Sequence, residues 1–253
     1  MSQRRLDEAE SAWDQVFALY VHLVTSPSGE YTFESAPALV QRLVRLSEPQ
    51  PDEIVLDMGA GWGKVTTAIA PLVKRVIAVD PSEENVEAAR EEVQQRGLTN
   101  VEFVIGSFLH PGVDERVDLI VSSSAFHHVA EEEKGEAIAI MHALLSETGR
   151  VVMCDPFFFF DPEEEPERFN RMYRYLMPRT VPEQMYKAYV EPHFRANPDY
   201  VYTWEDMKRY TPEEGQYYKL SDLIRRFETQ GFVVTQTDEL APFFGILVAR
   251  KAQ

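Results

Sequence analysis

Continuously apolar segments recur through the middle of the chain and are separated by longer segments of mixed polarity. The apolar segments predict strands at residues 53–57, 75–79, 101–105, 117–121 and 149–154. The segments between them predict helices at residues 63–71, 82–96 and 131–145. Strands that are apolar throughout, rather than at alternate positions, are typical of a parallel sheet covered by helices on both faces. The pattern therefore predicts an α/β fold.

The two ends of the chain extend this core. Over residues 6–24, apolar side chains recur three and four positions apart, which predicts an amphipathic helix. Residues 26–29 end it, and a second helix is expected over residues 35–46, with Pro37 in its first turn. Near the C-terminus the pattern predicts a helix and two strands, at residues 220–230, 232–238 and 243–249.

These elements form one decorated domain that spans all 253 residues. Its core is a Rossmann-like, doubly wound, mostly parallel sheet of seven predicted strands, built from residues 49–155 and 218–253. Residues 1–48 precede the core as N-terminal helices. Residues 156–217 are an insertion rich in Phe, Tyr and Pro before the last helix–strand–strand unit, with helix-like stretches near 163–176 and 182–190.

The chain is strongly acidic. It has 25 Lys and Arg against 42 Asp and Glu, and a formal net charge of −17 at pH 7. Binding to nucleic acid through the phosphate backbone needs a concentrated basic surface. We therefore expect no nucleic-acid partner, and we favour a small molecule or a peptide instead.

The cysteine content excludes further classes of site. Cys154 is the single cysteine, so the chain has neither an internal disulfide nor a multi-cysteine metal site. We expect no metal at the adjacent His127 and His128 either, because sequence neighbours rarely point at one ion. No apolar run approaches membrane-spanning length, and no leader-like segment begins the chain, so a cytoplasmic protein is expected.

A glycine-rich turn follows the first predicted core strand. It runs Asp57-Met58-Gly59-Ala60-Gly61-Trp62-Gly63, with glycines at alternate positions after an acidic residue. Glycines leave no side chain above the backbone and permit angles that other residues resist, so a ligand can lie against the main chain. The spacing differs from the G-x-G-x-x-G of dinucleotide-binding turns.

The D-x-G-x-G-x-G order resembles motif I of the class I S-adenosylmethionine (SAM) methyltransferases. This resemblance implies that the amino-acid end of SAM is held by Asp57, Gly59, Ala60, Gly61 and Gly63. The alternative, a glycine-rich turn without a ligand, is disfavoured by the strand that precedes it.

An acidic residue, Asp80, ends the second predicted core strand. In a Rossmann-like sheet a carboxylate at this place can accept hydrogen bonds from both ribose hydroxyls, and Pro81 follows it directly. Alternatively, Asp80 caps the next helix, although Ser82 can cap that helix and leave Asp80 to the ligand. Asp80 is therefore the predicted ribose-binding residue.

Ser107 and Phe108 follow the third predicted strand. The class I methyltransferases commonly carry an Asp at this place, which bonds the adenine amino group, with an apolar neighbour against the ring. Ser107 replaces that Asp here. The resemblance implies that adenine is bound by the Ser107 hydroxyl or the Phe108 amide.

The segment after the fourth predicted strand runs Ser122-Ser-Ser-Ala-Phe126-His127-His128. It resembles the corresponding segment of the ubiquinone/menaquinone-biosynthesis-like methyltransferases. The resemblance implies that Ser122 contacts the cofactor, while Phe126 and one histidine face the methyl group. A histidine here can act as a general base, because its pKa lies near neutrality. Alternatively, both histidines orient the loop or cap the following helix.

The insertion is where substrate choice is expected to reside. Four phenylalanines, Phe157 to Phe160, begin it, and many tyrosines follow. Exposed rings in this number promote aggregation, so they must cover something. They line a lid over an apolar acceptor, or they form the core of a lid or a homodimer interface. The residues expected to contact the substrate are Phe126, Phe157, His193 and Arg195.

The leading hypothesis is a SAM-dependent methyltransferase that modifies a small, apolar or aromatic molecule and releases S-adenosylhomocysteine (SAH). An enzyme that modifies SAM itself, as the carboxy-SAM synthases do, is a second interpretation. A non-catalytic SAM-binding partner of another subunit is a third. An NAD-dependent dehydrogenase is a fourth, disfavoured by the glycine spacing.

Overall fold

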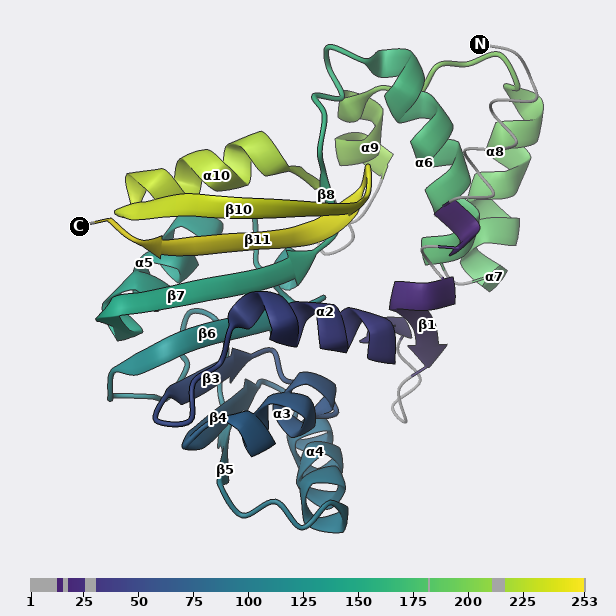
Figure 1. Cartoon of the computed structure of the whole chain (residues 1–253). Helices are drawn as coiled ribbons and strands as arrows, with labels where there is room; N and C mark the ends of the chain where they lie inside the picture. Colours follow the sequence, from purple (N-terminus) through teal and green to yellow (C-terminus); the bar gives the residue numbers. More distant parts are fainter. Residues whose placement is uncertain (1–12, 16–17, 26–30, 182, 211–216, 253) are drawn as a thin grey trace.

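A seven-stranded sheet forms the centre of the molecule (Figure 1). The computed structural model describes residues 13–15, 18–25, 31–181, 183–210 and 217–252. The sheet has the order β10-β11-β7-β6-β3-β4-β5. Its strands are β3 (Ile54–Met58), β4 (Arg75–Asp80), β5 (Val101–Ile105), β6 (Val117–Ser123), β7 (Leu145–Asp155), β10 (Phe232–Ala241) and β11 (Phe244–Lys251).

Strand directions follow the expectation of a mostly parallel sheet. β3 lies between β4 and β6 and is parallel to both, and β7 runs parallel to β6. β11 is antiparallel to both of its neighbours, β10 and β7. The doubly wound order and the antiparallel last strand confirm the fold predicted from the sequence.

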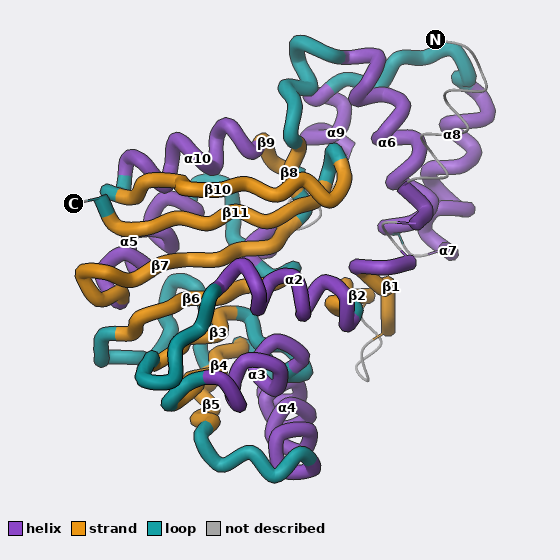
Figure 2. The backbone as a smooth tube through the Cα atoms, viewed as in Figure 1, coloured by secondary structure: helices purple, strands orange, loops and turns teal. Residues whose placement is uncertain are grey.

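Helices cover both faces of the sheet (Figure 2). They are α2 (Pro37–Ser47), α3 (Lys64–Ile69), α4 (Glu83–Gln95), α5 (Lys134–Leu144) and α10 (Leu220–Thr229). A 3-10 turn, η1 (Ala70–Leu72), extends α3. Alternate residues of a strand point to opposite faces, so Val55 packs with α2 and α3 while Leu56 packs with α5 and α10.

The N-terminal segment differs from the expected pair of helices. β1 (Val21–Thr25) pairs antiparallel with β2 (Tyr31–Ser35), so the predicted helix over residues 6–24 does not extend through its last residues. Residues 13–15 and 18–20 are helical, and the rest of that prediction lies outside the described residues. The apolar spacing at 21–24 suits a strand as well, because Val and Thr favour extended backbone. The second predicted helix is confirmed as α2.

The insertion forms a helical layer beside one end of the sheet (Figure 1). Its elements are β8 (Phe157–Phe158), α6 (Pro166–Thr180), α7 (Glu183–Met185), the π-helical segment η3 (Tyr186–Val190), α8 (Glu191–Ala196) and α9 (Trp204–Tyr210). β8 pairs with β9 (Tyr218–Lys219), where the chain returns to the core. The two ends of the insertion are therefore fastened side by side.

The insertion's largest rings are packed against one another. Phe158 contacts Phe169, Trp204 and Tyr217, with ring centroids 5.3–5.9 Å apart. All four side chains are buried. Tyr189, which is 75% exposed, is an exception. These four rings form a buried aromatic core within the insertion.

Candidate functional site

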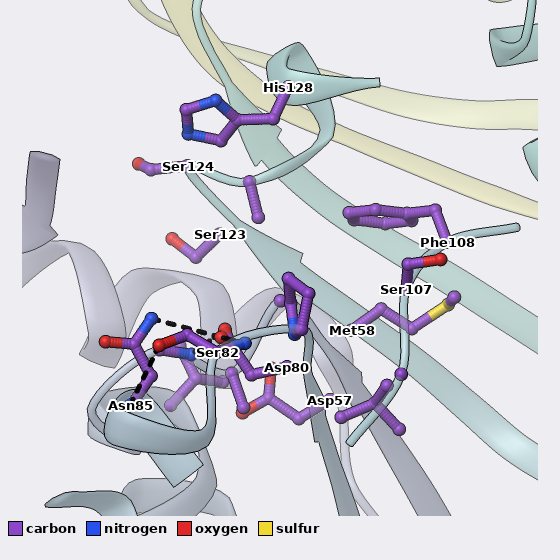
Figure 3. A pocket seen from close by; sticks show the side chains of 18 of the residues that line it. Asp57, Met58, Asp80, Ser82, Asn85, Ser107, Phe108, Ser123, Ser124 and His128 are labelled. Atoms are coloured by element: carbon purple, nitrogen blue, oxygen red, sulfur yellow. Dashed lines mark hydrogen bonds between the residues drawn. The ribbon is translucent and has the colours of Figure 1, made fainter. Parts of the chain in front are cut away.

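A cavity of about 510 Å³ lies at the carboxyl ends of β3, β4 and β6 (Figure 3). Ligands of doubly wound sheets bind at this edge, because the loops that leave adjacent parallel strands diverge there. The cavity is lined by residues from the glycine turn, the start of α4, the loop after β5 and the loop after β6. Ser35, at the end of β2, completes the wall.

The glycine turn forms the floor of the cavity. Gly59, Gly61 and Gly63 have φ angles of 75°, 52° and 78°, a region that side-chain-bearing residues rarely adopt. The Gly59 and Ala60 amides donate to the Val79 carbonyl at 2.8 and 3.0 Å, which fastens the turn to β4. Gly59, Ala60 and Gly61 line the cavity.

Close contacts below the turn explain two of these glycines. A Cβ atom on Gly59 would stand 2.3 Å from the Ala125 Cβ, and one on Gly63 would stand 3.0 Å from the Ala89 Cβ. Gly63 is the N-cap of α3 and packs against α4, so it shapes the turn from behind. A Cβ atom on Gly61 would meet nothing within 4 Å, so open space lies above this glycine.

Asp57 is buried beneath the turn. Its carboxylate accepts a hydrogen bond of 2.6 Å from the Thr66 hydroxyl of α3. Burial raises the pKa of Asp57 to about 7, and the neighbouring Asp80 adds to this rise while the Thr66 bond opposes it. A cation above the turn would favour the ionised form of this carboxyl group.

Asp80 connects the glycine turn to the start of α4. One carboxylate oxygen accepts from the Gly61 amide at 2.8 Å. The other accepts from the Ser82 amide and the Asn85 side-chain amide, both at 3.0 Å. Ser82 itself caps α4, because its hydroxyl accepts from the Asn85 amide. Asp80 and Pro81 both line the cavity.

Ser107 and Phe108 lie on the cavity wall after β5, as Figure 3 shows. The Ser107 hydroxyl accepts from the His110 amide at 3.2 Å, and the Ser107 amide donates to the His110 carbonyl. These bonds close a small loop. The Phe108 ring meets Phe126 edge-on, at a centroid distance of 5.3 Å. Its apolar surface therefore has a fixed position beside the cavity.

The two histidines occupy different environments in the 3-10 turn η2 (Phe126–His128). His128 lines the cavity. Burial, with a smaller contribution from His127, lowers the pKa of His128 to about 4, so its ring is neutral at pH 7. The two rings lie 4.1 Å apart between centroids.

His127 lies behind His128 and is tied to a buried carboxylate. Its Nδ1 is 2.9 Å from Oδ1 of Asp155, at the end of β7. The other Asp155 oxygen accepts a bond of 2.5 Å from the Tyr218 hydroxyl of β9. A proton on Nδ1 lets this nitrogen donate to the Asp155 carboxylate.

Comparisons with known proteins bear on this arrangement. A family model described as a methyltransferase domain matches residues 55–149. An uncharacterized methyltransferase of Alkaliphilus oremlandii is 30% identical over 161 residues, which are 63% of this chain and 69% of that protein. The chain belongs to the class I SAM-dependent methyltransferases. SAM is accordingly the cofactor of this methyltransferase.

Solved structures share the fold of this methyltransferase. The YcgJ protein of Bacillus subtilis has a TM-score of 0.56 and 20% identity, over 85% of this chain and 98% of that chain. A SAM-dependent methyltransferase from Aquifex aeolicus has a TM-score of 0.56 and 17% identity, over 84% and 89%. At these identities the similarity concerns the fold alone. Several other curated relatives match this chain over about half of their own length.

Some residues that the sequence predicted for the site of this methyltransferase lie away from the cavity. Ser122, Phe126 and Phe157 are fully buried in the core. His193 and Arg195 are exposed on α8, where His193 bonds with Asn197 and Arg195 with Glu191. No described residue of the insertion lines the cavity. The cavity wall therefore comes from the core and from Ser35.

Other lining residues had not been singled out from the sequence as part of the site. Trp62 and Asn85 are joined by a bond of 3.0 Å from the indole Nε1 to the amide oxygen. The position of Trp62 between two glycines was a usable signal. Ser35 bonds with Ser123 at 2.8 Å between hydroxyl oxygens, across the end of β6. No sequence signal joins this pair, because they are far apart along the chain.

Two kinds of feature are absent from the part of this methyltransferase that the structure describes. No group of three or more His, Cys, Asp or Glu there is arranged to hold a metal ion. No described helix is both long enough and apolar enough to cross a membrane.

Proposed function

We propose that this chain transfers the methyl group of SAM to a small, mainly apolar or aromatic acceptor. The observation that carries the proposal is one cavity lined by the glycine turn, Asp80 and His128. The glycine turn and Asp80 suit the cofactor, and His128 offers a neutral base on the opposite side of the cavity (Figure 3).

The cavity residues support this proposal for each part of SAM. Gly61 leaves open space above the turn that suits the amino-acid end, with Asp57 beneath the turn. Asp80 would accept from the ribose, because one of its about four acceptor positions is left after the bonds from Gly61, Ser82 and Asn85. Ser107 and Phe108 would bind adenine, through a polar edge and an apolar face.

SAM supplies an electrophilic methyl group on a sulfonium, so the protein's task is to align and desolvate the two reactants. The acidic cavity favours the cationic cofactor, because Asp57, Asp80 and Glu84 line it. His128 is neutral at pH 7 and can accept the proton that the acceptor loses. Its lowered pKa makes it a weak base, so alignment is the larger contribution.

Isothermal titration calorimetry with SAH tests the cofactor part of this proposal. We expect wild-type protein to bind SAH, and Asp80→Ala to weaken binding by about 10- to 100-fold, the usual effect of losing hydrogen bonds to a charged group. Asp114→Ala is the matched control, because Asp114 is exposed and outside the cavity. Equal affinities in all three proteins would contradict the assignment of Asp80 to the ribose.

A further inference from the structure

One cavity-lining side chain has a polar atom that the protein itself does not use. Ser124 is 8% exposed, and its buried hydroxyl has no hydrogen-bond partner among the described residues. It lies on the loop after β6 and lines the cavity. A buried hydroxyl without a partner is costly, so native structures rarely keep one without a reason.

The backbone at Ser124 strengthens this observation. Its φ angle is 53°, in the left-handed region that glycine adopts without strain. The Ser124 amide donates to the Cys154 carbonyl at 2.8 Å, which fixes the loop against β7. Glycine would satisfy the same backbone bond at lower conformational cost. The serine hydroxyl therefore contributes nothing to the fold that explains its presence.

His128 lies on the same wall as Ser124. Figure 3 shows both residues on the side of the cavity opposite Asp57 and Asp80. The His128 ring packs on His127, and its nitrogen atoms have no hydrogen-bond partner among the residues that the structure describes. The nearby Ser123 differs, because its hydroxyl is already bonded to Ser35.

The charges around the cavity limit what these two side chains can bind. The cavity is lined by the acidic residues Asp80, Glu84 and Glu133. Lys64 is a basic residue of the same lining. The His128 ring is neutral at pH 7, because burial lowers its pKa. An anionic acceptor would be repelled by these three carboxylates, which outnumber the basic lining residue. An uncharged polar group meets no such penalty.

We propose that Ser124 and His128 form the acceptor subsite, and that the acceptor is an uncharged small molecule whose hydroxyl or amine is hydrogen-bonded between these two side chains. This inference rests on the proposed methyl transfer. For a hydroxyl acceptor, Ser124 donates to one lone pair of the acceptor oxygen, and the acceptor O–H donates to a His128 ring nitrogen. The remaining oxygen lone pair forms the new bond to the methyl carbon. The C–S bond breaks with its electron pair left on sulfur, and the acceptor proton passes to His128.

The test measures how a panel of fragments binds to SAH-loaded protein, with ligand-observed NMR as the readout. The panel holds small phenols, aliphatic alcohols and arylamines, each paired with its O- or N-methylated analogue and with a carboxylate-bearing analogue. We expect hydroxyl or amine fragments to bind. The methylated analogues should bind about threefold to tenfold more weakly, the range for one neutral hydrogen bond. The carboxylates should bind most weakly.

Two variants test whether the Ser124 hydroxyl causes this preference. Ser124→Gly removes the hydroxyl and suits the left-handed backbone, and Ser124→Ala keeps the Cβ atom. Both should keep wild-type SAH affinity and lose the preference for the free hydroxyl. Ser146→Ala is the matched control, because the Ser146 hydroxyl is also buried and unpartnered but lies outside the cavity.

Three outcomes would overturn the subsite: no panel member binds, carboxylates bind best, or the Ser124 variants keep the wild-type preference. Failure of the wild-type protein to bind SAH is a different outcome. It would contradict the proposed function itself, before any fragment is added.

Discussion

Gly59 and Gly61 have similar left-handed backbones but opposite surroundings. A Cβ on Gly59 would overlap Ala125, whereas one on Gly61 would enter open cavity. The first glycine is required by the fold of the loop after β6. The second meets no protein atom, so its left-handed backbone is the constraint that the structure shows.

We therefore expect the two alanine variants to separate stability from binding. Gly59→Ala should lower the melting temperature clearly, because overlap adds to a left-handed strain of about 1–2 kcal/mol. Gly61→Ala should add only the backbone strain, so its melting temperature should fall less than that of Gly59→Ala. Its loss of SAH affinity, divided by its loss of melting temperature, should nevertheless be larger than in Gly59→Ala. Scanning calorimetry and SAH titration of both variants measure this. The same ratio of lost stability to lost affinity in both would refute the distinction.

The buried carboxyl of Asp57 predicts a pH dependence of stability. Its pKa is raised from 3.8 in the unfolded chain to about 7 in the folded protein, mainly by burial. The folded state therefore binds the proton more tightly, and this contribution is complete below about pH 4 and lost as the pH rises to about 7.

Urea unfolding of wild type and Asp57→Asn across this pH range isolates the effect. The wild-type free energy of unfolding, relative to the variant, should fall with rising pH by at most about 1.4 kcal/mol per pH unit. His128 has a lowered pKa and acts in the opposite direction, but it is present in both proteins and cancels. A difference that stays constant with pH would show that Asp57 is not the titrating group.

At the scale of elements, the base of the insertion is connected to the cavity wall. The β8–β9 pair places Tyr218 beside the end of β7, where its hydroxyl bonds Asp155. Asp155 in turn bonds His127 of η2, whose ring packs on His128. The strand that closes the insertion, β9, therefore supports the position of His128, although no described residue of the insertion lines the cavity.

Tyr218→Phe tests this connection. The variant leaves one oxygen of the buried Asp155 without its tyrosine partner, so we expect a loss of about 1–3 kcal/mol in the free energy of unfolding. The His127 and His128 imidazole ¹⁵N signals should also shift in NMR spectra. Tyr200→Phe is the control, because its hydroxyl bonds Asp206 in a more exposed position. Unchanged imidazole signals in Tyr218→Phe would refute the connection.

At the scale of the whole molecule, the net charge of −17 should act against the compact state. Raising NaCl from about 0.02 M to about 0.3 M shortens the Debye length to below about 10 Å and screens this repulsion. We expect the melting temperature to rise by a few degrees. A fall would mean that ion pairs such as Arg150 with Glu53 outweigh the net repulsion.

The sequence predicted the sheet and the cofactor turn well, because both depend on local patterns. Apolar runs define the parallel strands, and the alternate glycines with Asp80 define the cavity floor. Ser124 and Asp155 could not be identified this way, since their importance depends on contacts between segments far apart in the chain. The strand at residues 21–25 was missed because its apolar spacing fits helix and strand alike. The homodimer through the insertion stays a prediction.

The most direct test is a crystal structure with SAH bound. Adenine should lie at Ser107 and Phe108, the ribose at Asp80, and the amino-acid end above Gly59 and Gly61. The sulfur should face the wall that carries Ser124 and His128. SAH bound elsewhere, or with its sulfur turned away from that wall, would refute the proposed cofactor site.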